Sequence, residues 1–183
     1  MPAWVWIVIA VAVVVVVGLN IVSASRRRRL QSRFGPEYDR AVAESGSRRG
    51  ATSELRQREK RRQELDIVPL SAAASERYAQ QWQVAQARFV DQPGDAVREA
   101  DVLVVSVMGE RGYPMEDFEQ RSADISVDHP RLVDNYRAAH AISMANDQEK
   151  ASTEDLRQAM IHYRSLFDEL LGDTPAEQPR RVS

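Results

Sequence analysis

The sequence of 183 residues contains no cysteine. Disulfide bonds, thiolate metal sites and cysteine nucleophiles are therefore excluded. Lysine is scarce as well, since only Lys60 and Lys150 accompany the arginines. There is no GxSxG nucleophile pattern and no HExxH pair, and Gly109–Gly112 lacks the lysine of a Walker phosphate loop. The sequence thus predicts no catalytic, cofactor-binding or metal-ligating residue.

Charge is absent from one long stretch, residues 3–22, in which only Gly18 and Asn20 interrupt an apolar run. A helix of this length rises about 30 Å, which matches the hydrocarbon core of a bilayer. We therefore expect a single transmembrane anchor. A cleaved signal peptide is the alternative. It is disfavoured because no basic residue precedes the run and because the run exceeds the usual apolar length of such peptides.

Arginines follow this stretch at once. Basic residues beside a membrane span stay cytoplasmic, so we expect the N-terminus outside and the rest of the chain in the cytoplasm. The opposite orientation, an exported domain tethered to the membrane, is the alternative. The arginines closest to the bilayer are predicted to contact anionic lipids; they are Arg26, Arg27, Arg28, Arg29 and Arg33.

The remaining charges are unevenly distributed. Residues 23–62 carry a net charge of +8, whereas residues 63–183 carry −10. This asymmetry predicts a basic juxtamembrane stalk (23–66), an acidic domain (67–172) and a polar, disordered tail (173–183). Within the stalk, residues 52–65 are expected to form a solvated helical spacer, because Leu55 and Leu65 are its only large apolar residues. The acidity of the domain argues against a nucleic-acid partner.

The domain is expected to be all-α, a bundle of about five helices, because its apolar residues follow the helical period. Three boundaries are predicted from caps: Ser75 begins one helix, Asp95 begins the next, and Gly112 ends that one. A short helix is expected over 115–123, a connection over 124–127, and a helix beginning at Pro130 behind a cap at Asp128 or His129. A capping box at 152–155 predicts the last helix, which ends at Gly172.

One string of residues stands out as a candidate partner surface. It combines acids with aromatic and polar side chains that suit a basic protein: Tyr113, Glu116, Asp117, Glu119, Asp128 and His129. The simpler interpretation is that acids after a proline complement a helix dipole. A metal-dependent or other hydrolase is the rival class of function, and it would require His129, His140 and His162 to converge. We expect a membrane-anchored binding or scaffolding module with no enzymatic activity, with the bilayer and an unidentified protein as partners.

Several strings of the chain resemble an uncharacterised, chiefly actinobacterial family of small proteins with a single membrane span. They are Arg33–Asp39, Ala87–Asp91, Arg111–Pro114, Asp128–Val133, Tyr136–His140 and His162–Arg164. The resemblance covers most of the chain after residue 22. It implies no catalytic residues, because the family has no established activity.

Overall fold

The structure is a computed structural model that describes residues 24–25 and 28–172. The predicted anchor (3–22), Arg26, Arg27 and the predicted tail (173–183) lie outside these residues. The described residues are helical or irregular and contain no strand, so the all-α fold class is confirmed for them. No helix within this part of the chain is both long and apolar enough to cross a bilayer. The described chain divides between Arg56 and Gln57 into two compact units.

The first unit contains helical residues 28–34, helix α2 (Pro36–Ser45) and the first part of α3 (Arg48–Glu64). Gly35 precedes α2 with φ +51°, a left-handed conformation that glycine adopts without strain, and Pro36 opens the helix. The apolar side chains Leu30, Phe34, Tyr38, Ala41, Ala51 and Leu55 are buried. The predicted solvated spacer is therefore wrong in two respects: α3 begins at Arg48, and Leu55 is inaccessible to solvent.

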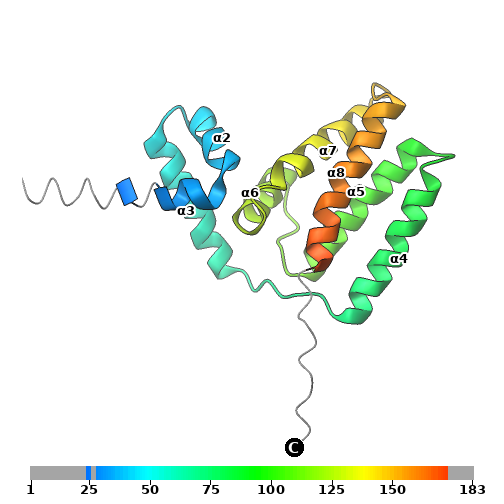
Figure 1. The fold of residues 1–183 in the computed structure, drawn as a ribbon, viewed down its shortest axis with the longest axis horizontal. Coiled ribbons are helices and arrows are strands. Elements are labelled where there is room, and N and C mark those ends of the chain that lie inside the picture. The colour runs from blue at the N-terminus through cyan, green and yellow to red at the C-terminus, as the bar shows by residue number, and fades with distance from the viewer. Residues whose placement is uncertain (1–23, 26–27, 173–183) are drawn as a thin grey trace, which may run out of the picture. The chain divides into compact units, whose positions relative to one another are not determined.

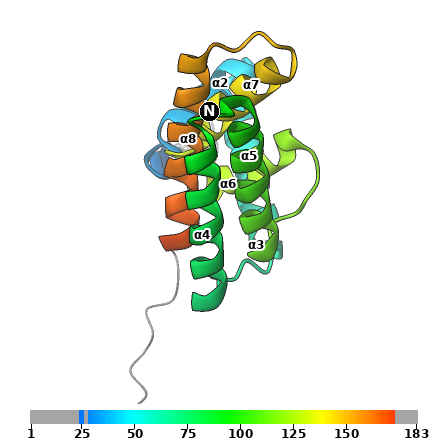
Figure 2. The same ribbon diagram turned by 90° about the vertical axis from the view of Figure 1, so that its right-hand side faces the viewer.

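The second unit contains the end of α3 and five further helices: α4 (Ala72–Arg88), α5 (Pro93–Glu110), α6 (Phe118–Asp128), α7 (Val133–Asp147) and α8 (Thr153–Gly172). Helix α5 packs against α4, α7 and α8, and α6 packs against α7. Both ribbon views show α4 lying along α5 (Figures 1 and 2). The five-helix bundle expected from the apolar periodicity is thus present.

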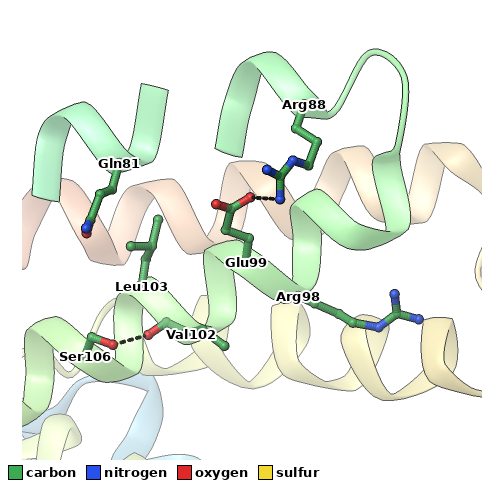
Figure 3. A pocket seen from close by; sticks show the side chains of 7 residues that line it. All are labelled: Gln81, Arg88, Arg98, Glu99, Val102, Leu103 and Ser106. Atoms are coloured by element: carbon green, nitrogen blue, oxygen red, sulfur yellow. Dashed lines mark hydrogen bonds and ion pairs between the residues drawn. The ribbon is translucent and has the colours of Figure 1, made fainter. Parts of the chain in front are cut away.

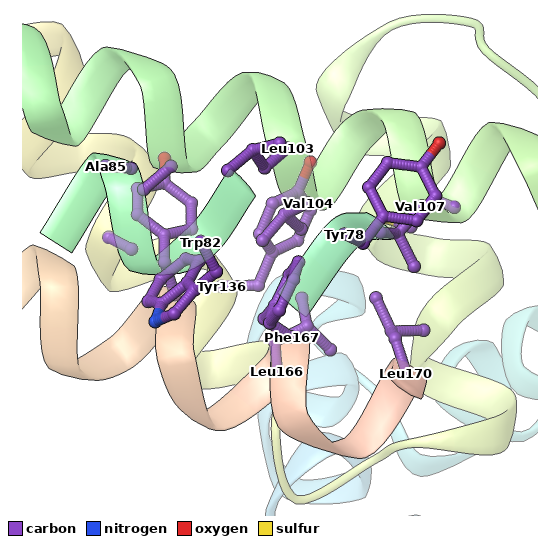
Figure 4. Close-up of a cluster of buried hydrophobic side chains, with 14 of the residues drawn as sticks. Tyr78, Trp82, Ala85, Leu103, Val104, Val107, Tyr136, Leu166, Phe167 and Leu170 are labelled. Atoms are coloured by element: carbon purple, nitrogen blue, oxygen red, sulfur yellow. The ribbon is translucent and has the colours of Figure 1, made fainter. Parts of the chain in front are cut away.

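Aromatic and aliphatic side chains together form the core of this unit (Figure 4). Trp82 of α4 stacks on Phe167 of α8 with ring centroids 4.7 Å apart, and Tyr136 of α7 meets Tyr163 of α8 edge-on at 6.5 Å. The buried faces of α4 and α8 are those that the helical spacing predicts. Removing this apolar area from water is the main stabilising term for the bundle.

The predicted helix boundaries are partly confirmed. Ser152 accepts a hydrogen bond from the Asp155 N–H while the Asp155 carboxylate accepts one from the Ser152 N–H, so the capping box is real. Gly112 follows α5 with φ +95°, and a Cβ there would meet the Asp66 carbonyl oxygen at 2.4 Å, so only glycine fits. The cap of α4 is Ser71, not Ser75, because the Ser71 hydroxyl accepts from the Ala74 N–H at 3.2 Å.

Three other boundaries differ from the prediction. Helix α5 begins at Pro93, so Asp95 lies in its first turn and is not its cap. Residues 124–127 continue α6 and form no connection. Helix α7 begins only at Val133, because residues 129–132 form a turn in which the Leu132 N–H bonds the His129 carbonyl at 3.0 Å. Proline at position 130 is therefore a turn residue.

Candidate functional site on the acidic side of α6

Helix α6 begins at a clear cap. The Asp117 side chain accepts a hydrogen bond from the Gln120 N–H at 2.9 Å, and Glu119 lies in the first turn. Asp117 therefore satisfies a free N–H group of the helix N-terminus, and both acids complement the helix dipole. The simpler interpretation holds for Asp117, although both side chains remain exposed.

Three other carboxylates, Glu116, Asp124 and Asp128, form what we call the acidic patch. Asp124 and Asp128 are four residues apart in α6 and so project from the same side of the helix. Glu116 lies just before the helix. Their side chains differ in exposure, from 58% for Glu116 through 24% for Asp128 to 0% for Asp124.

The patch is engaged by the last two turns of α3, residues 57–64, which we call the arginine segment. Arg61 contacts two of the acids, Glu116 at 2.8 Å and Asp124 at 3.4 Å. Arg62 donates to Asp128, and Arg58 donates to the buried Ser126 hydroxyl at 3.2 Å. All of these residues belong to the second unit.

The arginine segment has no apolar side chain, since its sequence is QREKRRQE. It is therefore held to α6 by polar contacts alone, unlike the helices that pack in the core. Its partly exposed pairs, such as Arg62 with Asp128, contribute about 0–1 kcal/mol each and weaken with salt, and only the pair of Arg61 with the buried Asp124 is stronger. The attachment is consequently weak in comparison with the rest of the bundle.

Asp124 is the unusual member of the patch. Its side chain is fully buried, and one carboxylate oxygen accepts from Gln120 at 3.0 Å while the other has no hydrogen-bond partner among the described residues. Burial raises the pKa of Asp124, and the nearby Arg61 opposes that rise. Arg61 is the largest of the groups that favour the ionised form of Asp124, ahead of Gln120 and Arg58.

Tyr113 fixes the other end of the patch. Its hydroxyl donates to Asp128 at 2.7 Å, and the side chain is only 2% exposed. Burial, together with the neighbouring Asp128 carboxylate, raises the pKa of Tyr113 well above its usual range. The hydroxyl therefore stays protonated and holds Asp128 in place for Arg62.

The structure divides the predicted partner surface. Tyr113 and His129 are buried, with His129 only 6% exposed, so neither contributes area to a partner. Glu116, Asp117 and Glu119 are exposed, and Asp128 is partly exposed but bonded to Arg62 and Tyr113. The sequence did not indicate the arginine segment or Asp124. Their charges and four-residue spacings are visible in the sequence, but nothing there pairs position 61 with a residue 63 positions later.

A second polar cluster lies between α5, α7 and α8. The Tyr163 hydroxyl donates to Asp101 at 2.7 Å, and the His140 Nδ1 lies 3.9 Å from the same carboxylate. His140 stacks on Phe118 with centroids 3.8 Å apart. Burial by itself would raise the pKa of Asp101, but His140 and Tyr163 outweigh it and lower that pKa. The cluster has no serine or threonine in a nucleophile pattern.

The other histidines have different neighbours. His129 Nδ1 lies 3.5 Å from Glu169, and His162 is partly exposed on α8. Within the described part of the chain, no three histidine or acidic side chains are grouped so that they could hold a metal ion. The convergence that the rival hydrolase interpretation required is not found among these residues.

A groove of about 520 Å³ runs between α4 and α5 (Figure 3). Leu103 and the 61% exposed Val102 supply its apolar part, and Arg88 pairs with Glu99 across it at 2.9 Å. Arg98, which also lines the groove, pairs with Asp95 and Asp147 outside it, so each charged group of the groove already has a partner.

The predicted lipid-contact arginines are described only in part. Arg28, Arg29 and Arg33 are exposed, and the guanidinium of Arg33 lies 6.0 Å from the ring centroid of Phe34. Arg26 and Arg27 lie outside the described residues.

Comparison with known proteins identifies no relative. No protein-family model, no curated protein and no solved structure matches this chain.

Proposed function

We propose that this chain is a membrane-anchored helical binding module that takes a basic helical segment on its acidic patch. One observation carries the proposal: three arginines of a single helical segment already lie on or beside the patch. Arg61 and Arg62 reach Asp124 and Asp128, which are spaced one turn apart on α6. The patch therefore has the spacing that a basic helix requires.

The chain's own arginine segment is then the first occupant of the site. Because polar contacts alone hold it, a partner helix that combines arginines with a few apolar residues can displace it. The hinge for release is short. The Val68 N–H bonds the Arg111 carbonyl at 2.9 Å, so only Leu65, Asp66 and Ile67 lie between the segment and that fixed point.

The proposed location follows from the sequence. Residues 3–22 anchor the chain, its N-terminus lies outside, and the two units lie at the cytoplasmic face, where Arg26–Arg29 and Arg33 contact anionic lipid. A reporter enzyme fused after Ser183 should be active only in the cytoplasm. Activity outside the membrane would reverse the orientation, and a chain released by alkaline washing would remove the anchor.

The binding site is tested with a labelled peptide copying residues 48–64, added to the full chain in detergent. In a variant with Arg58, Arg61 and Arg62 replaced by alanine, the patch is vacant. The peptide should bind this variant about tenfold more tightly than it binds the wild type. In the wild type the arginine segment occupies most patches, and the apparent affinity for the peptide falls in proportion to the fraction of patches that are vacant. Adding Glu116→Lys should abolish the gain.

The same helix offers a matched control. Replacing Arg49, Arg56 and Lys60 by alanine removes the same charge from exposed positions. This control should bind the peptide as weakly as the wild type. Equal peptide affinity for the two triple variants would attribute the effect to net charge and contradict a specific site.

A further inference from the structure

Helix α3 carries a second row of basic residues, which form no ion pair with any residue that the structure describes. Positions 49, 56 and 60 are separated by seven and four residues, so Arg49, Arg56 and Lys60 lie along one side of the helix. We call this row the outer stripe. Leu55 and the arginine segment's Arg58 lie on the opposite side. Of the acids of α3, Glu54 and Glu59 lie off the row, and Glu64 lies one turn beyond Lys60 at the end of the helix.

The outer stripe is exposed and unpaired. Arg49, Arg56 and Lys60 are exposed, and none forms an ion pair or a side-chain hydrogen bond with any residue that the structure describes. Several arginines of the second unit, by contrast, form ion pairs. Arg77 pairs with Glu110 at 2.7 Å and Arg157 with Glu154 at 2.6 Å. Exposed cations without counter-ions in a chain of net charge −2 point to an external anionic surface.

We propose that the outer stripe of α3 binds the anionic headgroups of the membrane surface. This inference rests on the proposed membrane anchor, which would place α3 near the bilayer. Three cations on one side of a single helix suit a charged surface. Ser53 and Gln63 are its neighbours, so the row has no apolar side chain to insert, and attraction is electrostatic.

The expected strength follows from the three cations. Each basic side chain near an anionic leaflet contributes about a fivefold gain in binding. Three such side chains therefore give roughly a hundredfold preference for lying on the surface. The attraction should fall steeply with ionic strength, because its range is the Debye length. Phosphates of nucleic acid offer the same chemistry, and the experiment separates the two sources.

The absence of cysteine makes the experiment direct. Ser53→Cys places one thiol within the outer stripe for a fluorescent donor, in the full chain reconstituted into vesicles with acceptor-labelled headgroups. Energy transfer should be higher in vesicles containing phosphatidylglycerol than in neutral phosphatidylcholine vesicles, and high salt should remove the difference. The Arg49→Ala, Arg56→Ala, Lys60→Ala variant should lose the difference.

The control variant removes the same charge from three paired arginines of the second unit, by Arg77→Ala, Arg98→Ala and Arg157→Ala. It should retain the lipid-dependent transfer. If the chain stays with the vesicles but energy transfer does not depend on lipid charge, the proposed lipid binding by the outer stripe is wrong, whereas the proposed anchor stands. A chain that leaves both kinds of vesicle on alkaline washing refutes the anchor and this inference with it. If energy transfer does not depend on lipid charge but the chain binds duplex DNA, and only the outer-stripe variant loses that binding, the outer stripe is a nucleic-acid site.

Discussion

Replacing Arg61 by methionine tests whether its cation is what keeps Asp124 ionised in the fold. Methionine keeps the length and apolar volume of the side chain but removes the charge. Breaking a buried ion pair on one side costs about 3–5 kcal/mol, and losing an exposed one about 0–1 kcal/mol. Asp124 is fully buried but Arg61 is 37% exposed, so an intermediate loss of about 1–3 kcal/mol is expected.

The second half of the cycle removes the partner acid and should cost less stability. Asp124→Asn keeps the shape and removes the buried charge, so it should cost under about 1 kcal/mol. The double variant should then recover most of the stability that Arg61→Met loses. Free energies of unfolding come from urea titrations followed by circular dichroism. Losses in the double variant that equal the sum of the two single losses would refute the pairing.

The pH dependence of the stability lost in Arg61→Met is an independent test of the pairing. The pKa of Asp124 is already raised in the folded chain, and removing the cation raises it further. An acid with a raised folded pKa is stabilising once protonated, so stability is regained as the pH falls through that pKa. The deficit of Arg61→Met should therefore shrink on acidification. A deficit that stays constant would show that Asp124 does not sense Arg61.

Three further predictions concern the bundle. Trp82→Ala should lower the free energy of unfolding, measured by calorimetry, by about 3–5 kcal/mol, because Trp82 is 5% exposed and stacked on Phe167. Trp82→Phe should cost less, because the indole N–H has no hydrogen-bond partner among the described residues. The lowered pKa of Asp101 means that its ionised form stabilises the fold above the ordinary value of 3.8 and that this contribution is lost as the pH falls through the lowered pKa. Asp101→Asn should therefore flatten the acid limb of a plot of melting temperature against pH, and an unchanged limb would contradict the assignment. Ser152→Ala should lower the free energy of unfolding by about 1 kcal/mol through loss of the cap of α8, and no change would show that the capping box is redundant.

Apolar spacing predicted the bundle well because each helix has one buried face. Tyr78, Trp82 and Ala85 of α4 are buried as their spacing requires, and the same holds for Tyr163 and Phe167 of α8. Helix starts were less predictable. Serine occurs at both 71 and 75, and only the structure shows which hydroxyl meets a free N–H.

The acidic patch could not be predicted as a site because charges at the surface leave no periodic signal. Acids near Glu116 suggested a partner surface, but Tyr113 is buried and bonded to Asp128, fifteen residues later. The role of the arginine segment was missed for a similar reason. A basic, apolar-poor helix is normally solvated, and its docking depends on a complementary helix remote in sequence.

The most direct measurement of the central claim is hydrogen exchange of residues 57–64 in the full chain, with and without the peptide copying residues 48–64. If the acidic patch binds basic helices and the arginine segment is its resident occupant, saturating peptide should increase amide exchange in residues 57–64. Exchange in α6 should at the same time stay slow, because the peptide replaces the segment there. Peptide binding that leaves residues 57–64 as protected as before would contradict the account.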